Sequence, residues 1–162
     1  MYSSVDVHNR LQELDIPHEI FKLPEPAASL ERAAAALGLE PGQLARVELF
    51  RVDGEPVMVI VPGDREVDVS KLMDITGGEE VVPVPKDETS SLTGYHASAV
   101  PPVGLKAEMQ AYIDYFTLKE DVIYTGGGEP SKILKIRSYD LVRATGGETV
   151  DVVLPLDEGR GT

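Results

Sequence analysis

The segment "LARVELFRVDG", residues 44–54, carries a cation and a carboxylate in a setting where both could take part in chemistry. Its alternation with a period of two predicts a strand that ends in an Asp-Gly turn. Positions 45, 47 and 49 are apolar on one face, while the other face carries Arg46 and Glu48 between apolar residues. A strand that is apolar on both faces is typical of a covered, central position. Because an unpaired cation there is costly, Arg46 is predicted either to face a polar ligand or to be neutralised by Glu48.

A glycine-rich segment, "TGGGEPSK" at residues 125–132, follows a predicted strand and could approach a phosphate group. A P-loop, however, needs a Gly-Lys-Ser/Thr sequence that opens a helix. Here Lys132 follows Pro130 and Ser131, and the next residues alternate as in a strand, which argues against a P-loop. Two interpretations stay open: the glycines let the backbone approach another ligand with several N–H donors, or they form a flexible hairpin turn.

Nucleophilic and metal-ligating residue types are scarce. The chain has no cysteine, and its histidines, His8, His18 and His96, lack metal-ligand spacing, so no metal is predicted. His8 and His18 are expected on the surface. His96 and Ser98 lie close together in a loop, but no Gly-x-Ser-x-Gly elbow is present, so a catalytic triad is not predicted.

The segment "AVPPVG", residues 99–104, contains two consecutive prolines. Each proline fixes its own φ and pushes the preceding residue into an extended conformation. A rigid loop loses little entropy when a ligand binds, which suits a pocket wall. The alternative is a plain connector between strands.

Composition limits the class of protein. A length of 162 residues indicates one domain. The 28 acidic and 15 basic residues give a formal charge of -13, which argues against general DNA or RNA binding while leaving room for a local basic rim. The same charge is also explained as an adaptation for solubility. No apolar run is long enough for a membrane span and no secretory signal is recognised, so a cytoplasmic location is expected.

Hydrophobic periodicity and capping residues predict five helices and eight strands. Ser3 or Ser4, Ser29 and Asp68 are the expected caps of the first three helices, and Leu37 is expected on the buried face of the second. The helices are expected over residues 4–15, 29–38, 69–76, 86–94 and 138–145, and the strands over 18–23, 44–52, 57–61, 79–85, 107–116, 120–125, 131–137 and 149–156. Interspersed helices and hairpins indicate an α+β fold with a mixed sheet.

Three segments together resemble a known family. They are "QLARVELFRVDGEPVMVIVPGDREVDVSKL", "SAVPPVG" and "VIYTGGGEPSKILKIRSYDLVRATG", in this order. They are similar to the aminoacyl-tRNA editing domains of the YbaK and prolyl-tRNA-synthetase-associated type, over about residues 3–150. The resemblance implies a single α+β domain over residues 1–155, with a mixed, partly barrel-like sheet flanked by helices, and a flexible tail over 156–162. It also implies hydrolysis of the ester of a mischarged tRNA without a metal or cofactor.

The resemblance carries over to individual residues. Arg46 takes the place of the family's lysine; it can grip phosphate or carboxylate but cannot act as a base. Ser98 takes the place of the first glycine of the proline loop, and no histidine follows the glycine loop, where some relatives carry one. The residues implied in catalysis are Arg46, Ser98 and Ala99, the last two through backbone N–H groups that stabilise the oxyanion. The residues implied in substrate binding are Val47, Gly94, His96, Pro102, Gly104, Thr125, Gly126, Gly127 and Gly128.

The leading hypothesis is a freestanding editing deacylase that removes a small amino acid from a mischarged tRNA. The alternative is a catalytically impaired member of the fold that binds an amino acid, a nucleotide or a synthetase. A third hypothesis is an acidic scaffold without a pocket. The expected partner is the 3′ end of tRNA with its aminoacyl group, with an aminoacyl-tRNA synthetase as a further candidate, and neither DNA nor a membrane is expected.

Overall fold

The computed structural model describes residues 1–156. Of the predicted tail, residues 157–162 lie outside this range. The elements follow one another as α1 (Ser4–Glu13), β1 (His18–Lys22), α2 (Leu30–Ala36), η1 (Pro41–Gln43), β2 (Ala45–Val52), β3 (Glu55–Pro62), α3 (Val69–Thr76), β4 (Val81–Pro83), α4 (Lys86–Thr93), η2 (Ala97–Ala99), β5 (Gln110–Asp114), η3 (Tyr115–Lys119), β6 (Val122–Gly126), β7 (Lys132–Arg137), α5 (Ser138–Thr145) and β8 (Glu148–Val150). No described helix is long and apolar enough to cross a membrane.

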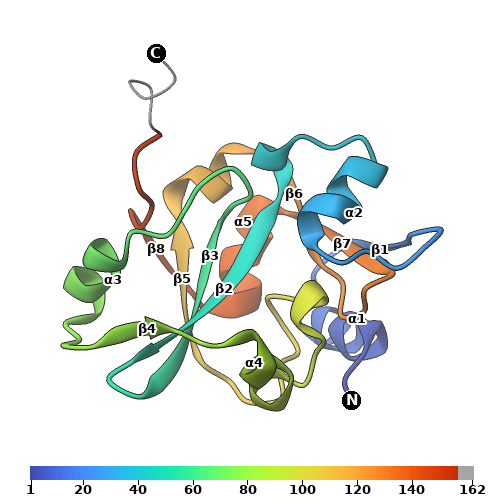
Figure 1. Cartoon of the computed structure of the whole chain (residues 1–162). Helices are drawn as coiled ribbons and strands as arrows, with labels where there is room; N and C mark the ends of the chain where they lie inside the picture. Colours follow the sequence, from blue (N-terminus) through green and yellow to red (C-terminus); the bar gives the residue numbers. More distant parts are fainter. Residues whose placement is uncertain (157–162) are drawn as a thin grey trace.

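The strands form two sheets (Figure 1). One has three antiparallel strands in the order β1-β7-β6, and the other has five strands in the order β4-β2-β3-β5-β8. The larger sheet is mixed, because β3, β5 and β8 run parallel while β2 is antiparallel to both of its neighbours. An isolated bridge between Leu44 and Tyr124 links the sheets. The predicted α+β class with a mixed sheet is therefore confirmed, with the strands divided between two sheets.

The β2–β3 hairpin is the longest pairing in the fold. Eight residue pairs join the strands, from Ala45 opposite Pro62 to Val52 opposite Glu55. Asp53 and Gly54 form the two-residue turn with φ values of 50° and 87°. Two positive φ angles fit a turn whose twist matches that of the strands, which is why Asp-Gly favours it. The hairpin predicted from the sequence is confirmed.

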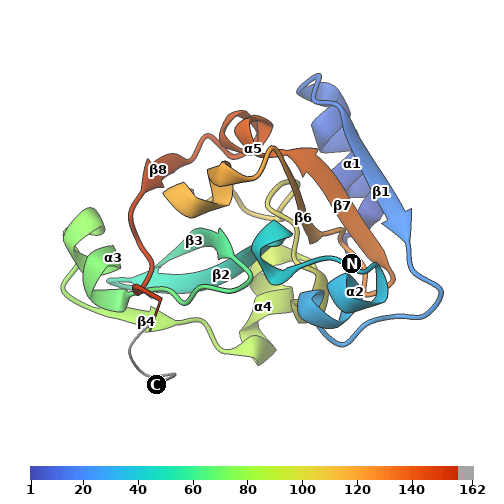
Figure 2. The same ribbon diagram turned by 90° about the horizontal axis from the view of Figure 1, so that it is seen from above.

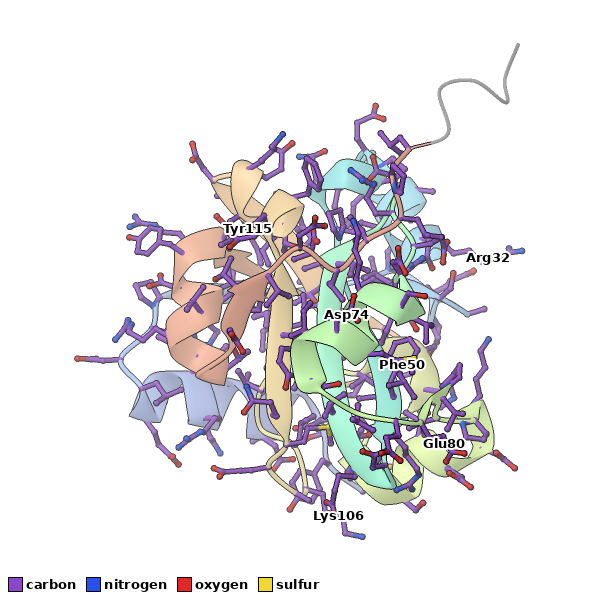
Figure 3. The ribbon with its side chains drawn as sticks, turned by 90° about the vertical axis from the view of Figure 1, so that its left-hand side faces the viewer. Arg32, Phe50, Asp74, Glu80, Lys106 and Tyr115 are labelled. Carbon is purple, nitrogen blue, oxygen red and sulfur yellow. The ribbon has the colours of Figure 1, made fainter. Side chains whose placement is uncertain are left out.

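Strand β2 packs on hydrophobic cores through both faces. Ala45 and Leu49 belong to the larger core, which also contains residues of α1, β6, β7 and α5. Phe50 belongs to the smaller core together with Leu72 of α3. Figure 3 shows α3 lying over this side of the hairpin, with Phe50 beside it. The predicted covered position of this strand is confirmed.

Helix boundaries follow local capping. Ser3 caps α1 and Ser29 caps α2, while Asp68 accepts hydrogen bonds from two backbone N–H groups at the start of α3. Leu37 was expected on the buried face of α2, and this expectation is wrong: its exposed fraction is 39%. The helix ends at Ala36, so Leu37 is a cap residue that no longer follows the helical stripe. Figure 2 shows α3 at one end of the molecule and α1 with β1 at the other.

The glycine and proline loops are packed directly against each other. A side chain on Gly126 would overlap the carbonyl group of Val100 and lie 2.8 Å from the carbonyl carbon of Ala99. Gly128 has a φ of 95°, and its N–H donates to the Ala99 carbonyl at 2.9 Å. The glycines therefore allow close approach to another backbone segment, and they fix the proline loop against the end of β6.

Replacing Gly126 with alanine should reduce stability, because the new methyl group has no space beside the Val100 carbonyl. Overpacking of this kind costs about 1–3 kcal/mol. Gly42→Ala is the matched control, since the nearest atom to its new methyl group is 3.7 Å away, an ordinary contact. Urea unfolding of both variants is the measurement, and a Gly126→Ala variant as stable as Gly42→Ala would contradict the close packing of the two loops.

Candidate functional site

A cavity of about 410 Å³ opens between α2, β2, the start of α4 and η2. Figure 1 shows η2 lying between α2 and α4 on this side of the molecule. The residues that line this cavity are Ala28, Ser29, Leu30, Glu31, Arg46, Val47, Glu48, Lys86, His96, Ala97, Ser98, Val100 and Gly126. The cavity therefore joins the three segments on which the family resemblance depends.

Arg46 reaches this cavity from β2, and protein groups already hold its guanidinium. Its Nη2 atom donates to the Arg65 carbonyl oxygen at 2.7 Å. Glu48 lies 2.9 Å from Nε, although that N–H does not point at the carboxylate, so the contact is an ion pair without a hydrogen bond. Glu66 and Glu31 lie 3.5 and 3.9 Å from the two Nη atoms. Arg46 is thus paired with Glu48, which is one of the two predicted alternatives. It also lines the cavity, so contact with a polar ligand stays a prediction.

Three carboxylates surround this single guanidinium, and the pKa of Glu48 is shifted by its surroundings. Its partial burial raises its pKa above the ordinary value, and the charges of Glu66 and Glu31 add to the increase. Arg46 and Lys86 act in the opposite direction and lower the pKa. The balance leaves a carboxylate whose charged form is poorly stabilised by its surroundings.

The proline loop contributes a tight turn at its start. His96 Nδ1 accepts a hydrogen bond from the Ser98 N–H at 3.1 Å and lies 2.8 Å from Ser98 Oγ. Since an N–H can only donate, Nδ1 is the unprotonated nitrogen and the Ser98 hydroxyl also donates to it. The Ala99 N–H donates to the His96 carbonyl at 3.0 Å. Both backbone donors proposed for the oxyanion are therefore engaged within the turn in this structure.

The glycine segment contributes one residue to the cavity lining, Gly126. Thr125 is fully buried, and its hydroxyl has no hydrogen-bond partner among the described residues. A side chain on Gly127 would meet the backbone of Lys132, and one on Gly128 would meet the backbone of Ser3. Gly127 and Gly128 thus serve the packing of the loop and are absent from the lining.

The far end of the proline loop faces a different cavity. Pro102 and Gly104 line a space of about 580 Å³ beside α1 and α5. Gly94 packs on the ring of Tyr2, and Tyr95 donates a hydrogen bond to the Gly104 carbonyl at 2.7 Å. Of the residues implied for the site, the structure brings together Arg46, Val47, His96, Ser98 and Gly126 and places the others outside this lining.

Two charged residues at this cavity were missed by sequence reasoning, Glu31 and Lys86. Glu31 lies in the first turn of α2 and Lys86 begins α4, where acidic and basic residues are common on solvated faces. No motif marks them, because their proximity to Arg46 depends on how the helices pack on β2. In the described part of the chain, no group of three or more His, Asp or Glu side chains is placed to hold a metal ion.

Comparison with known proteins identifies the family. The model of the aminoacyl-tRNA editing domain matches residues 24–144. The chain belongs to the aminoacyl-tRNA editing domain family. A proline--tRNA ligase of Maridesulfovibrio salexigens is 37% identical over 92 residues, which cover 57% of this editing domain and 16% of the ligase. The editing domain thus spans about a sixth of the length of that relative.

Two further relatives match over most of their length. A protein of Enterococcus faecalis with the provisional name Cys-tRNA(Pro)/Cys-tRNA(Cys) deacylase EbsC is 24% identical over 134 residues, 82% of this chain and 81% of its own. A solved structure described as a candidate trans-editing enzyme for prolyl-tRNA synthetase has a TM-score of 0.84 and 24% identity, covering 94% of this chain and 97% of that one. That structural likeness confirms the fold.

Replacing Arg46 with alanine should destabilise the domain. The change removes a hydrogen bond to the Arg65 carbonyl and leaves Glu48 without its cation. Because the Arg46 side chain is only 17% exposed, we expect a loss of about 1–3 kcal/mol. Arg32→Ala is the control, since Arg32 points away from the molecule (Figure 3) and should change stability by less than about 0.5 kcal/mol. Equal melting temperatures for the two variants would mean that Arg46 is not structural.

Replacing Glu48 with glutamine should remove a pH dependence of stability. A carboxyl group whose pKa is raised on folding favours the folded state below the pKa of the unfolded chain, and this contribution is lost as the pH rises through the folded pKa. The variant should therefore gain stability relative to the wild type at pH 7, with the difference shrinking toward pH 4. Melting curves of both proteins from pH 4 to pH 7 are the measurement. The prediction is contradicted if the stability of the variant minus that of the wild type is smaller at pH 7 than at pH 4.

Proposed function

We propose that this protein is a freestanding editing deacylase that hydrolyses the ester between a tRNA and a small, wrongly attached amino acid. The observation that carries the proposal is the cavity itself, which joins β2, the start of the proline loop and Gly126 in a member of the editing family. The name of the Enterococcus relative, which matches over most of both chains, supports a deacylase that acts as a separate protein.

The size and lining of the cavity favour a small aminoacyl group. Leu30, Val47, Ala97 and Val100 supply apolar surface around the charged residues. A volume of about 410 Å³ lies near the lower end of the roughly 300–1,000 Å³ typical of ligand sites. Since the terminal ribose must share this space with the amino acid, a short side chain fits best.

The ester is an activated electrophile, so the protein mainly has to position the carbonyl and the attacking water. Water adds to the carbonyl carbon, and the bond to the ribose oxygen breaks as that oxygen gains a proton, which gives a free amino acid and an intact tRNA. Lys86 is the cation of the lining that we assign to the tRNA phosphates, because the Arg46 guanidinium is already held by Arg65 and by carboxylates. The Ser98 hydroxyl donates its hydrogen to His96 Nδ1, so its oxygen is a candidate acceptor for a hydrogen bond from the substrate.

A second candidate function is binding without hydrolysis. Arg46 stands where the family has a lysine, and the N–H groups of Ser98 and Ala99 are both engaged within their turn. A domain with these features could hold an aminoacyl group, or dock on a synthetase, without stabilising an oxyanion. The net charge of -13 favours a protein partner over unaided tRNA binding.

Deacylation of a panel of mischarged tRNAs separates these functions. We expect hydrolysis of at least one tRNA that carries a small amino acid, unaffected by EDTA. Lys86→Ala should raise KM at least about tenfold with a smaller change in kcat, since it removes a phosphate contact that ground state and transition state share. Lys106→Ala is the control, because Lys106 lies outside the cavity lining. No hydrolysis of any member of the panel would overturn the deacylase and favour the binding function.

A further inference from the structure

The wall of the cavity formed by β2 and α2 carries more negative than positive charge. Arg46 is one cation, while Glu31, Glu48 and Glu66 lie 3.9, 2.9 and 3.5 Å from its nitrogen atoms. Glu31 and Glu48 belong to the cavity lining itself. A wall of this composition repels phosphate and attracts a small cation.

Glu48 is the most buried carboxylate of this group, since its side chain is 39% exposed, against 48% for Glu31 and 75% for Glu66. Among residues 1–156 no donor forms a hydrogen bond to it, and the Arg46 contact involves one of its two oxygens. Burial without hydrogen bonds penalises a carboxylate, and the pKa of Glu48 is raised accordingly. A half-buried carboxylate with free acceptor capacity, at the edge of a cavity, is positioned to receive a charged donor from a ligand.

We propose that Glu48, assisted by Glu31, binds the α-ammonium group of the aminoacyl substrate, so that the cavity selects esters with a free α-amine. This inference rests on the proposed function for the identity of the site. An aminoacyl ester carries its ammonium on the carbon next to the ester carbonyl. Anchoring the ammonium at Glu48 therefore holds that carbonyl within the same cavity, whose lining includes Ser98.

The same wall also favours release of the product. Hydrolysis converts an uncharged ester into a carboxylate, so the free amino acid brings a new negative charge next to Glu48 and Glu31. Like charges brought together at a binding surface are unfavourable. An ester with a free amine is thus bound more tightly than the amino acid that it yields.

Two amide analogues that cannot be hydrolysed as esters test the inference directly. One is adenosine with alanine joined to its 3′ position through an amide, and the other carries lactate, in which a hydroxyl replaces the ammonium at almost the same size. We expect calorimetry at pH 7 to show at least about tenfold tighter binding of the alanyl compound, equivalent to about 1.4 kcal/mol. Glu48→Gln should abolish this preference and leave binding of the lactyl compound unchanged.

Glu88→Gln is the matched control, because Glu88 also pairs with an arginine, Arg51 at 3.6 Å, and does not line the cavity. It should keep the full preference for the alanyl compound. Equal binding of the two compounds by the wild type, or no binding of either, would overturn the inference. A preference that depends on Glu48, in a protein that hydrolyses no mischarged tRNA, would retain the ammonium site and reject the deacylase.

Discussion

Strand β2 is buried on both faces, and Arg46 lies on it between the two cores. The strand cannot turn Arg46 into solvent without also removing Leu49 or Phe50 from a core. The guanidinium is therefore fixed in place and must be neutralised there, which the Arg65 carbonyl and the surrounding carboxylates accomplish. The fixed Arg46 guanidinium also sets the position of the cavity, because α2 and α4 supply the cavity walls on either side of it.

The packing of the two loops is a second consequence of limited space. Gly126 leaves room for the Val100 carbonyl, and the Gly128 N–H donates to the Ala99 carbonyl. The glycine loop therefore holds the proline loop in place. A pocket wall that is held in this way needs little rearrangement when a ligand binds. The glycines contribute to the candidate site mainly through the backbone they position.

Stability and function place opposite demands on Glu48. Its surroundings disfavour the charged form, so the fold would be served by a neutral residue of the same size. A cationic ligand, in contrast, binds more tightly to a charged carboxylate than to a neutral residue. Proteins commonly retain such a cost at binding sites, where the strained or poorly solvated group is the one that acts on the ligand. The proposed ammonium site would account for the three carboxylates around one guanidinium, which are more than its neutralisation requires.

The sequence by itself determined the α+β class, the β2–β3 hairpin and the caps at Ser29 and Asp68, because these depend on periodicity and on turn and capping residues that act locally. It also determined the family, and with it that Arg46, Ser98 and Gly126 would be near one another. Only the tertiary structure decided that β5 and β6, consecutive in the chain, belong to different sheets. It also separated Pro102 and Gly104 from the site and brought in Glu31 and Lys86. Such proximities depend on how whole helices and strands pack. The local sequence around each residue does not indicate which distant residues will lie beside it.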